Sequence, residues 1–336
     1  MRRGQHRVTD ISLILCTRDR CARLDATLAS ITRAVAAAPG LVVEVVIVDN
    51  GSTDATPARL VAWRADQSFP VVLLNEPRPG LSRARNRGLA AARGRIVAMT
   101  DDDCVLHADH LAGLAACFAE VAGPAIIGGR ILPGDPADLP VTVKLEDHPM
   151  IAAPRAFPGG FVMGANLAFT ADVVTRIGPF DERFGAGAPF VAAEDTDFLF
   201  RALGQGIPVR YDPRFTVDHH HGRRDEATVA RLLAGYSFGD GALYAKHRRD
   251  PRIRTAIRQD LRDLWLDIAD PVPPCGGIRR FYLFRLRHKL AGFQAYWRTG
   301  RGQALTGTHS DGREALKAAS CQKNAKNVVD ARGALP

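Results

Sequence analysis

Short apolar runs alternate with stretches of helical periodicity in the first third of the chain, and no other feature of the sequence restricts the fold as much. The runs lie at residues 11–16, 42–48, 71–74 and 96–99. Helices are expected before Pro39, from Asp54 and over residues 81–92. Strands joined through helices pair in parallel, with helices on both faces of the sheet. The sequence therefore predicts an α/β fold with a mostly parallel, Rossmann-like sheet flanked by helices.

Polar residues follow each of the four predicted strands. They are Thr17-Arg18-Asp19-Arg20, Asp49-Asn50-Gly51-Ser52, Asn75-Glu76 and Thr100-Asp101-Asp102-Asp103. The carboxyl ends of parallel strands meet at one edge of a sheet, where the ligands of such proteins bind. We therefore expect these residues to share one site.

Three adjacent aspartates, Asp101 to Asp103, are the residues of this edge whose placement costs the most free energy. Burial and mutual repulsion both disfavour neighbouring carboxylates. One aspartate is enough to cap the following helix, whereas several suit a hard divalent cation that also binds substrate phosphates. The sequence therefore predicts a Mg²⁺ or Mn²⁺ site at this strand end.

Two other groups near this edge have both a structural and a functional explanation. Asp49 and Asn50 precede a turn and a helix start, and a carboxylate there also suits hydrogen bonds from a base or ribose. Arg83, Arg85 and Arg87 lie at the start of a helix, where the helix dipole disfavours cations. Two explanations are open for these arginines. Either they are solvated on an exposed face of the helix, or their forked donors bind a phosphate.

A helix expected after Ala192 begins with three acidic residues, Glu194, Asp195 and Asp197. Acidic residues stabilise the start of any helix, and Asp197 is placed to pair with Arg201 one turn later. Asp195 has a second interpretation, as a general base projected into a cleft.

Three consecutive histidines, His219 to His221, follow a stretch typical of a strand. Alternation along a strand places His219 and His221 on one face and His220 on the other. A single histidine is more often structural, but a cluster downstream of an acidic site favours a metal ligand.

The remaining segments suggest a division of the chain into three parts. Residues 125–131 form an expected strand, and the Pro- and Gly-rich residues 133–160 form a loop of a length that is more often functional than idle. We expect a catalytic domain over 1–224, with halves at 8–104 and 105–224, a helical extension over 225–300 and a flexible tail over 301–336. The helices of the extension are expected near residues 228–247, 254–267 and 278–297.

Composition narrows the class of protein. The 336 residues are 46% hydrophobic and 24% charged, which indicates a globular chain, and the net charge of +9 favours an anionic partner. The six cysteines show no C-x-x-C spacing, so we expect neither zinc nor disulfides, and a cytoplasmic location. No apolar run has the length of a membrane span and no signal peptide is recognisable, so a soluble protein is expected.

Six segments resemble, in order and spacing, the family 2 glycosyltransferases of the GT-A fold. They are ILCTRDR, IVDNGSTD, GLSRARNRGLAAARG, MTDDDC, the stretch from GGFVMGAN to GPFDERFG, and AAEDTDFLFRA. The resemblance covers about residues 8–224. It implies a transferase that uses a nucleotide-sugar and a divalent metal, Mn²⁺ or Mg²⁺, and that inverts the anomeric carbon.

Matched position by position, the resemblance also implies roles for individual residues. It places the nucleotide-sugar on Thr17, Arg18, Arg20, Asp49, Asn50, Arg83, Arg85, Asn86, Asp101 and Asp102. The D-x-D motif puts the metal on Asp103 and Asp101, completed by His219. Asp195 matches the catalytic base and Glu194 its acidic neighbour, while Gly164 and Asn166 fall on the acceptor side. Asn50 stands where the family usually has a second acid.

The implied reaction assigns the two groups of acids different tasks. The metal neutralises charge that grows on the leaving nucleotide, and Asp195 removes the proton of the acceptor hydroxyl. We expect a nucleotide-diphosphate sugar as donor, a UDP-sugar first, and a glycan, lipid-linked or small-molecule acceptor. Residues 278–298 mix arginine with aromatic residues, which fits either a packed helix or an interfacial helix on the inner face of an anionic membrane.

Two other functions fit parts of the sequence. A sugar-phosphate nucleotidyltransferase has a similar fold and acidic metal ligands, but favours a Gly-rich loop with a lysine where this chain has Thr17-Arg18-Asp19-Arg20. A non-catalytic nucleic-acid-binding module would explain the basic helices, but no known reader motif is present. We therefore expect no nucleic-acid partner.

Overall fold

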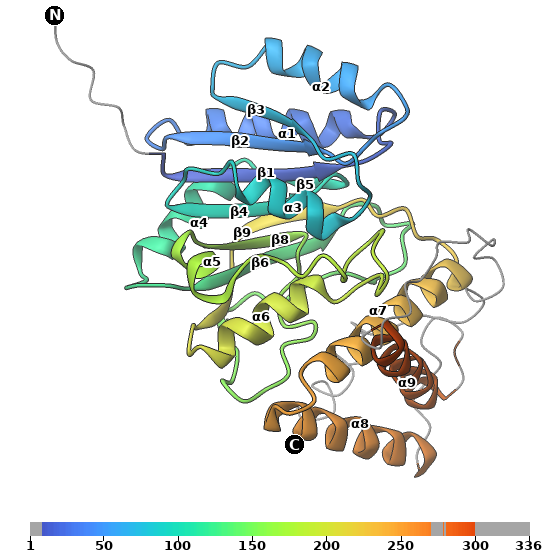
Figure 1. The fold of residues 1–336 in the computed structure, drawn as a ribbon. Coiled ribbons are helices and arrows are strands. Elements are labelled where there is room, and N and C mark those ends of the chain that lie inside the picture. Colours follow the sequence, from blue (N-terminus) through green and yellow to red (C-terminus); the bar gives the residue numbers. More distant parts are fainter. Residues whose placement is uncertain (1–8, 270–277, 279, 300–336) are drawn as a thin grey trace, which may run out of the picture.

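The computed structural model describes residues 9–269, 278 and 280–299 (Figure 1). Its strands are β1 (Ile11–Thr17), β2 (Val43–Asp49), β3 (Val71–Asn75), β4 (Ile96–Asp101), β5 (Cys104–Leu106), β6 (Ile126–Pro133), β7 (Met150–Ile151), β8 (Asn166–Thr170) and β9 (Val209–His219). Its helices are α1 (Leu24–Ala36), α2 (Thr56–Ala65), α3 (Leu81–Leu89), α4 (His110–Ala119), α5 (Asp172–Ile177), α6 (Glu194–Gly204), α7 (Glu226–Lys246), α8 (Pro251–Ala269) and α9 (Phe281–Thr299). The predicted tail at 301–336, Cys275 and Cys321 lie outside the described residues.

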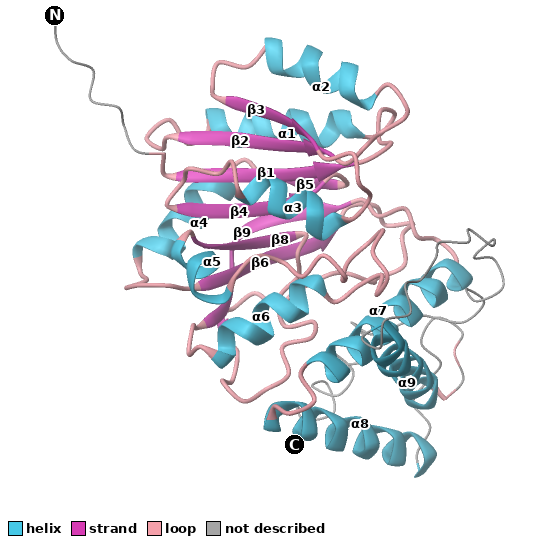
Figure 2. Ribbon diagram, viewed as in Figure 1, coloured by secondary structure: helices cyan, strands magenta, loops and turns pink. Residues whose placement is uncertain are grey.

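One sheet of nine strands forms the centre of the molecule, in the order β3-β2-β1-β4-β8-β6-β9-β5, with β7 paired to β9 (Figure 2). The four strands predicted from the first apolar runs are its parallel part. Helices α1 and α4 contribute to the apolar core on one face, while α5 and α6 pack on the other. This confirms an α/β fold with helices on both sides of the sheet.

The second half of the sheet is mixed. β8 lies antiparallel between β4 and β6, and β5 lies antiparallel to β9, while β6 and β9 are parallel. The chain enters β8 from the long segment after β6, which contains the short strand β7, and not through a helical crossover from a parallel neighbour. The parallel arrangement predicted from βαβ units therefore applies to β1, β2, β3 and β4 and does not extend over the whole sheet.

Helices α7, α8 and α9 pack together after the sheet (Figure 1). α7 and α9 cross at two glycines: a Cβ on Gly241 would lie 1.9 Å from the Lys289 carbonyl oxygen, and one on Gly292 would lie 1.9 Å from the Phe238 carbonyl oxygen. The buried Lys289 ammonium binds Asp260 of α8 at 2.7 Å and Tyr244 of α7 at 3.0 Å, which ties the three helices together. Among the helices described, none is both long and apolar enough to cross a bilayer.

Candidate active site

The parallel strands bring their polar ends to one edge, as the sequence predicts. Thr17 lies opposite Asp49 across β1 and β2, and Cys16 lies opposite Asp101 across β1 and β4. Asp49 is buried, and one of its oxygens accepts a hydrogen bond from the Ser52 N–H at 3.0 Å. The register of the parallel strands alone therefore brings these side chains to one edge of the sheet.

Asn50 has a structural role at this edge. Its side-chain amide donates to the carbonyl oxygens of Glu76 and Arg78, each at 2.8 Å, and its oxygen accepts from the Gly80 N–H at 2.9 Å. Both amide donors are thus used to hold the loop that leads into α3. The predicted contact of Asn50 with base or ribose would have to use its remaining acceptor capacity.

Each of the three adjacent aspartates has a cationic partner from the protein. Asp101 contacts Arg85 at 3.3 Å, and Asp102 contacts Arg20 at 3.1 Å. Asp103 lies 3.5 Å from Arg20 and 3.2 Å from His219. These ion pairs offset part of the free-energy cost of placing three carboxylates next to one another. That cost by itself is therefore not evidence for a metal ion.

The protonation of these aspartates differs because their surroundings differ. Burial raises the pKa of Asp102 to about 6, although the charge of Arg20 opposes the shift. Burial also acts to raise the pKa of Asp103, but the hydrogen bond and charge of His219 outweigh it and lower that pKa. Asp103 is therefore the member of the group best kept as an anion, as a metal ligand must be.

His219 is oriented as a metal ligand would be. The Thr142 hydroxyl donates to the Val141 carbonyl oxygen, so the His219 Nδ1 is left to donate to the Thr142 carbonyl oxygen, 3.2 Å away. The other ring nitrogen, Nε2, then faces the Asp103 carboxylate at 3.2 Å. A bare lone pair would be repelled there, so Nε2 requires either a proton or a cation between the two groups.

The surrounding donors fit a hard or borderline cation. Asp103, Cys104 and His219 place one ligand atom each within 4.8 Å of one another. Burial raises the pKa of Cys104 well above its usual value, which keeps the thiol protonated and leaves carboxylate and imidazole as the donors. As the strand pattern predicts, His219 and His221 are buried on one side and His220 is exposed.

Arg85 connects the aspartates to the first turn of α6. Arg85 is only 3% exposed, and its guanidinium contacts Asp101 at 3.3 Å and Glu194 at 2.9 Å. A Cβ on Gly164 would lie 2.5 Å from this guanidinium, so glycine is required beside it. Asp101 and Glu194 are therefore held on one buried arginine, although the sequence separates them widely.

Protein carboxylates also explain why arginines occur at the start of α3. Arg85 is paired with Asp101 and Glu194, and Arg83 contacts Glu182 at 3.1 Å. These anions compensate the unfavourable placement of cations near the helix N-terminus. A phosphate is thus not needed to account for these two side chains.

The Asp195 carboxylate is held by two backbone donors. Gly164 N–H donates to one oxygen at 3.0 Å and Thr196 N–H to the other at 2.7 Å. The turn before it contains Val191 and Ala193 in the left-handed region, with φ of 46° and 69°. This conformation is unfavourable for residues other than glycine, so contacts outside the turn must maintain it.

The protein itself uses the side chains of two predicted site residues. Asn166 is 1% exposed, and its amide binds the carbonyl oxygens of Arg130 and Phe215 and the ring of His110, so it supports the sheet, while its place on the acceptor side stays a prediction. Asn86 exchanges two hydrogen bonds of 2.9 Å with the backbone of Phe180. Its side chain fixes that loop, which leaves it poorly placed to line a nucleotide pocket.

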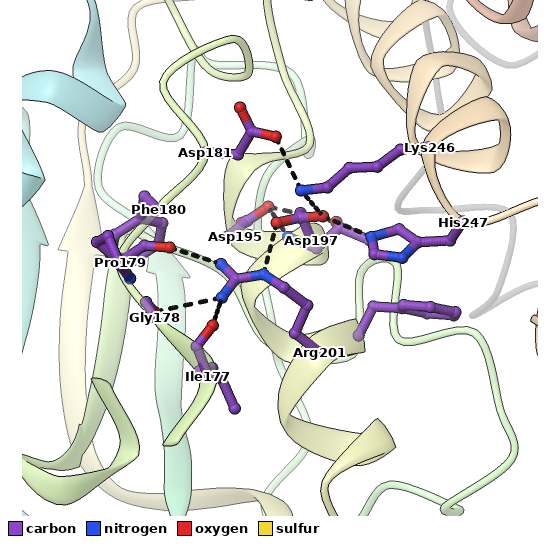
Figure 3. Close-up of polar contacts among 12 residues, drawn as sticks. Ile177, Gly178, Pro179, Phe180, Asp181, Asp195, Asp197, Arg201, Lys246 and His247 are labelled. Atoms are coloured by element: carbon purple, nitrogen blue, oxygen red, sulfur yellow. Dashed lines mark hydrogen bonds and ion pairs between the residues drawn. The ribbon is translucent and has the colours of Figure 1, made fainter. Parts of the chain in front are cut away.

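Other residues at the site were missed by the sequence analysis. Burial raises the pKa of Tyr236 on α7, and the charges of Asp195 and Glu194 act in the same direction, which places this phenol near the proposed base. Asp197 pairs with Arg201 at 2.8 Å as predicted, but Lys246 and His247 also bind it (Figure 3). The sequence carries no local signal for these contacts, because all three additional residues lie beyond the catalytic segment.

A cavity of about 440 Å³ opens beside Asp103. Its charged and polar lining includes Arg23 before α1, Asp135 and Asp138 after β6, and His220 and Arg224 after β9. This volume lies in the range of small-molecule sites. Asp103 therefore borders open space and is not sealed inside the protein.

The pH dependence of stability should report on Glu194. Burial raises the pKa of Glu194 from 4.5 to about 7, the charge of Asp195 adds to this, and Arg85 opposes it. The pKa of Glu194 is higher in the folded protein than in the unfolded chain, so protonation of Glu194 stabilises the folded state. This stabilisation is complete below about pH 4.5 and is lost as the pH rises through about 7. We expect Glu194→Gln to remove about 3 kcal/mol of this pH-dependent change in unfolding free energy, measured by urea denaturation.

An exposed glutamate supplies the control for that measurement. Glu226 lies in the first turn of α7 at the surface, so Glu226→Gln should leave the pH profile of the wild type unchanged. Identical profiles for Glu194→Gln and the wild type would show that Glu194 titrates normally.

Comparison with known proteins identifies the first half of the chain. Residues 12–150 match the model of the family described as "Glycosyl transferase family 2". The succinoglycan biosynthesis protein ExoO of Rhizobium meliloti is 45% identical over 85 residues, 24% of each chain. A glucosyl-dolichyl phosphate glucuronosyltransferase of Haloferax volcanii is 26% identical over 184 residues, 52% of this chain and 58% of that protein. The matches thus span a quarter to under two thirds of these relatives.

A solved structure matches over a larger part of the chain. It is the mannosyltransferase PcManGT from Pyrobaculum calidifontis in complex with GDP-Man and Mn²⁺, with a TM-score of 0.56, 18% identity and coverage of 88% of both chains. At this identity the likeness concerns the fold, which is that of the GT-A glycosyltransferases. Residues 12–150 are thus similar to glycosyl transferase family 2, and the described part of the chain has a fold similar to that of the GT-A glycosyltransferases.

Proposed function

We propose that the protein is an inverting glycosyltransferase that moves a sugar from a nucleotide-diphosphate sugar to a hydroxyl group of an acceptor. The observation that supports this most is the Arg85 bridge, which holds Asp101 of the strand-end aspartates and Glu194, the neighbour of Asp195, on one guanidinium. A donor site at the strand ends and a base at the start of α6 would then act on the same sugar.

The donor side would be formed by the strand ends. Asp103 and His219 would hold Mn²⁺ or Mg²⁺, and the bound ion would supply positive charge for the diphosphate. Asp101 and the buried Asp49 are the acids proposed for contacts to the sugar nucleotide. The fold likeness to a protein solved with GDP-Man and Mn²⁺ supports this class of donor, and a UDP-sugar and a GDP-sugar are both to be tested.

The acceptor side would be formed by Asp195. Gly164 and Thr196 fix its two oxygens, so the carboxylate has a defined direction from which it can remove the proton of an acceptor hydroxyl. A single base suits a single displacement, in which the acceptor oxygen forms its bond as the bond to the nucleotide breaks. That course inverts the configuration of the anomeric carbon.

A panel of nucleotide-sugars tests this function. Purified protein would be incubated with UDP-glucose, UDP-GlcNAc or GDP-mannose, with Mn²⁺ or with EDTA, and the products would be separated by ion-exchange chromatography. We expect one donor to release its nucleoside diphosphate in the presence of Mn²⁺. Formation of a nucleotide-sugar and pyrophosphate from a sugar phosphate and a nucleoside triphosphate would instead establish the alternative, a nucleotidyltransferase.

The helical extension offers a surface for the proposed membrane contact. The sequence leaves two alternatives for α9, a packed helix or an interfacial one. One of its faces is packed, with Phe281, Tyr282 and Lys289 buried, while Leu283 and Leu290 are exposed. On α8, by contrast, Ile257, Leu261, Trp265 and Ile268 follow one another at helical spacing and are 38% to 67% exposed.

The charges beside this apolar strip favour an anionic partner. Arg254, Arg258 and Arg262 are exposed and lie beside this strip on the same side of α8. Two of its three acidic residues turn inward, since Asp260 binds Lys289 and Asp267 is buried. An apolar strip bordered by arginines suits the surface of an anionic bilayer, so we propose that α8 rests on the membrane and brings the site to a lipid-linked acceptor.

Vesicle sedimentation tests the membrane contact. We expect the protein to sediment with vesicles of phosphatidylcholine and phosphatidylglycerol at low salt but not with pure phosphatidylcholine, and Trp265→Glu to bind about tenfold less. Val61→Glu is the matched control, because Val61 on α2 is 62% exposed and lies outside the helical extension. Equal binding by the two variants would contradict the proposal, as would self-association in gel filtration that only Trp265→Glu abolishes.

A further inference from the structure

The C-terminal end of α7 binds the helix that carries Asp195 (Figure 3). The link is Asp197, whose side chain is fully buried in the first turn of α6. One carboxylate oxygen accepts from Lys246 at 2.7 Å and from His247 at 2.8 Å, and the other accepts from Arg201 at 2.8 Å. Two of the three donors thus come from the helical extension and not from the catalytic domain.

The same network fixes the loop in front of α6. Arg201 also donates to the carbonyl oxygens of Gly178 and Pro179, at 3.2 and 2.8 Å. Lys246 reaches Asp181 at 2.8 Å as well as Asp197. Asp197 and its partners therefore join three segments, namely α6, the loop after α5 and the end of α7.

A second contact places α7 against the turn that precedes Asp195. A Cβ on Gly239 would lie 2.8 Å from the Ala192 carbonyl oxygen, so the two backbones touch. Gly235, one turn earlier on α7, faces the Val191 side chain, with 3.7 Å from its ideal Cβ position to a Val191 methyl. This turn contains the left-handed Val191 and Ala193, a conformation that external contacts must maintain.

Buried charge makes this contact sensitive to the loss of a partner. Burial acts to raise the pKa of Asp197, but the hydrogen bond of His247 and the charges of Lys246 and Arg201 lower it to about 2. Removing one donor would leave a buried carboxylate with incomplete partners, which is relieved by movement of the helix or entry of water. Asp195 lies two residues away in the same turn, so such movement would displace it.

We propose that Lys246 and His247 are positioning residues, which hold the first turn of α6 so that the Asp195 carboxylate points at the acceptor. This rests on the proposed function of Asp195 as the base. It assigns the helical extension a part in transfer itself, in addition to any contact with an acceptor or a membrane.

The alternative is that the network contributes only to stability, and a second lysine bound by a carboxylate separates the two cases. Lys289 is buried in the helical extension and bound by Asp260 and Tyr244, which lie on α8 and α7. Lys246→Met and Lys289→Met therefore remove the same charge from comparable surroundings. Of the two residues, Lys246 is the one bound to α6.

Kinetics with the donor selected from the panel, at a temperature well below the Tm of each variant, provide the first test. We expect Lys246→Met to lower kcat by about 10- to 100-fold, because a shift of about 1 Å in a catalytic group has an effect of that size. The KM for the donor should change by less than about threefold, since the strand ends are untouched. Lys289→Met should lower Tm and keep kcat, and Lys246→Arg should recover part of the activity.

Hydrogen–deuterium exchange provides a readout that needs no substrate. We expect faster exchange of the amides of residues 191–198 in Lys246→Met than in Lys289→Met. His247→Leu, which keeps Lys246, serves as the milder variant if Lys246→Met does not fold. Equal kcat and equal exchange for the two lysine variants would overturn the proposal.

Failure of this inference is distinguishable from failure of the proposed function. If Asp195→Asn keeps full turnover, Asp195 is not the base and the reason for positioning it disappears. If Asp195→Asn is inactive while Lys246→Met and His247→Leu are fully active, the function stands and the positioning role is wrong.

Discussion

Asp195→Asn is expected to keep nucleotide-sugar binding and to lose transfer by about 100- to 10,000-fold. The amide has the shape of the carboxylate and retains an oxygen that can accept from Gly164 or Thr196, so the start of α6 should be preserved. It cannot remove a proton from a hydroxyl group. The loss should therefore appear in kcat and leave the dissociation constant of the donor nearly unchanged.

Isothermal titration with the donor and steady-state kinetics with donor and acceptor would measure these two quantities. Asp172→Asn is the matched control, because Asp172 lies in the first turn of the neighbouring helix α5 and accepts from the Thr170 hydroxyl at 2.6 Å. We expect that variant to transfer at the wild-type rate. Undiminished turnover by Asp195→Asn would remove Asp195 from the role of base.

Asp103→Asn should weaken binding of Mn²⁺ by at least about 100-fold, the upper range seen when groups merely supporting a metal ligand are replaced. The carboxylate faces His219 Nε2 at 3.2 Å, and the arrangement of Thr142 makes Nε2 the nitrogen available to a cation. A neutral amide removes the charge that would attract the ion. Nucleotide-sugar turnover should fall together with metal binding.

Electron paramagnetic resonance titration of Mn²⁺ measures this binding without a sugar substrate. His219→Gln should weaken it too, while His220→Gln should not, because the ligand atoms grouped with Asp103 are those of Cys104 and His219 and do not include the exposed His220. Wild-type affinity in Asp103→Asn would mean that Asp103 interacts only with Arg20 and His219. Wild-type turnover in EDTA would contradict a metal requirement altogether.

The parallel part of the sheet was predictable because the sequence signals for its strands are local. The buried runs that became β1, β2, β3 and β4 could be recognised from composition and spacing, and parallel pairing then brought their polar ends together. Asp197 and Arg201 lie one turn apart on a helix, so their pairing also followed from the sequence. In the sheet the residues lie at the ends of neighbouring strands, and in the helix they lie one turn apart.

The contacts that complete the site were not predictable, because they join residues distant in the sequence. Arg85 and Glu194 are 109 residues apart, and Asp197 and His247 are 50 apart. No periodicity encodes such pairs. Composition also could not show that the side-chain amides of Asn86 and Asn166 donate to backbone carbonyl groups, because those groups are distant in the sequence.

The antiparallel position of β8 escaped prediction for a related reason. Its strand character is visible in the sequence, but its direction depends on how the long segment after β6 returns to the sheet. That return is set by contacts of the segment with β9, such as the pairing of Met150 with Tyr211. Loop geometry of this kind has no sequence period.

A crystal structure of Asp195→Asn with Mn²⁺ and the donor selected from the panel tests the central claim most directly. We predict Mn²⁺ bound by Asp103 and His219 and by the diphosphate, with the anomeric carbon between the ion and residue 195. A diphosphate bound away from Asp103, or a sugar directed away from the first turn of α6, would contradict the account.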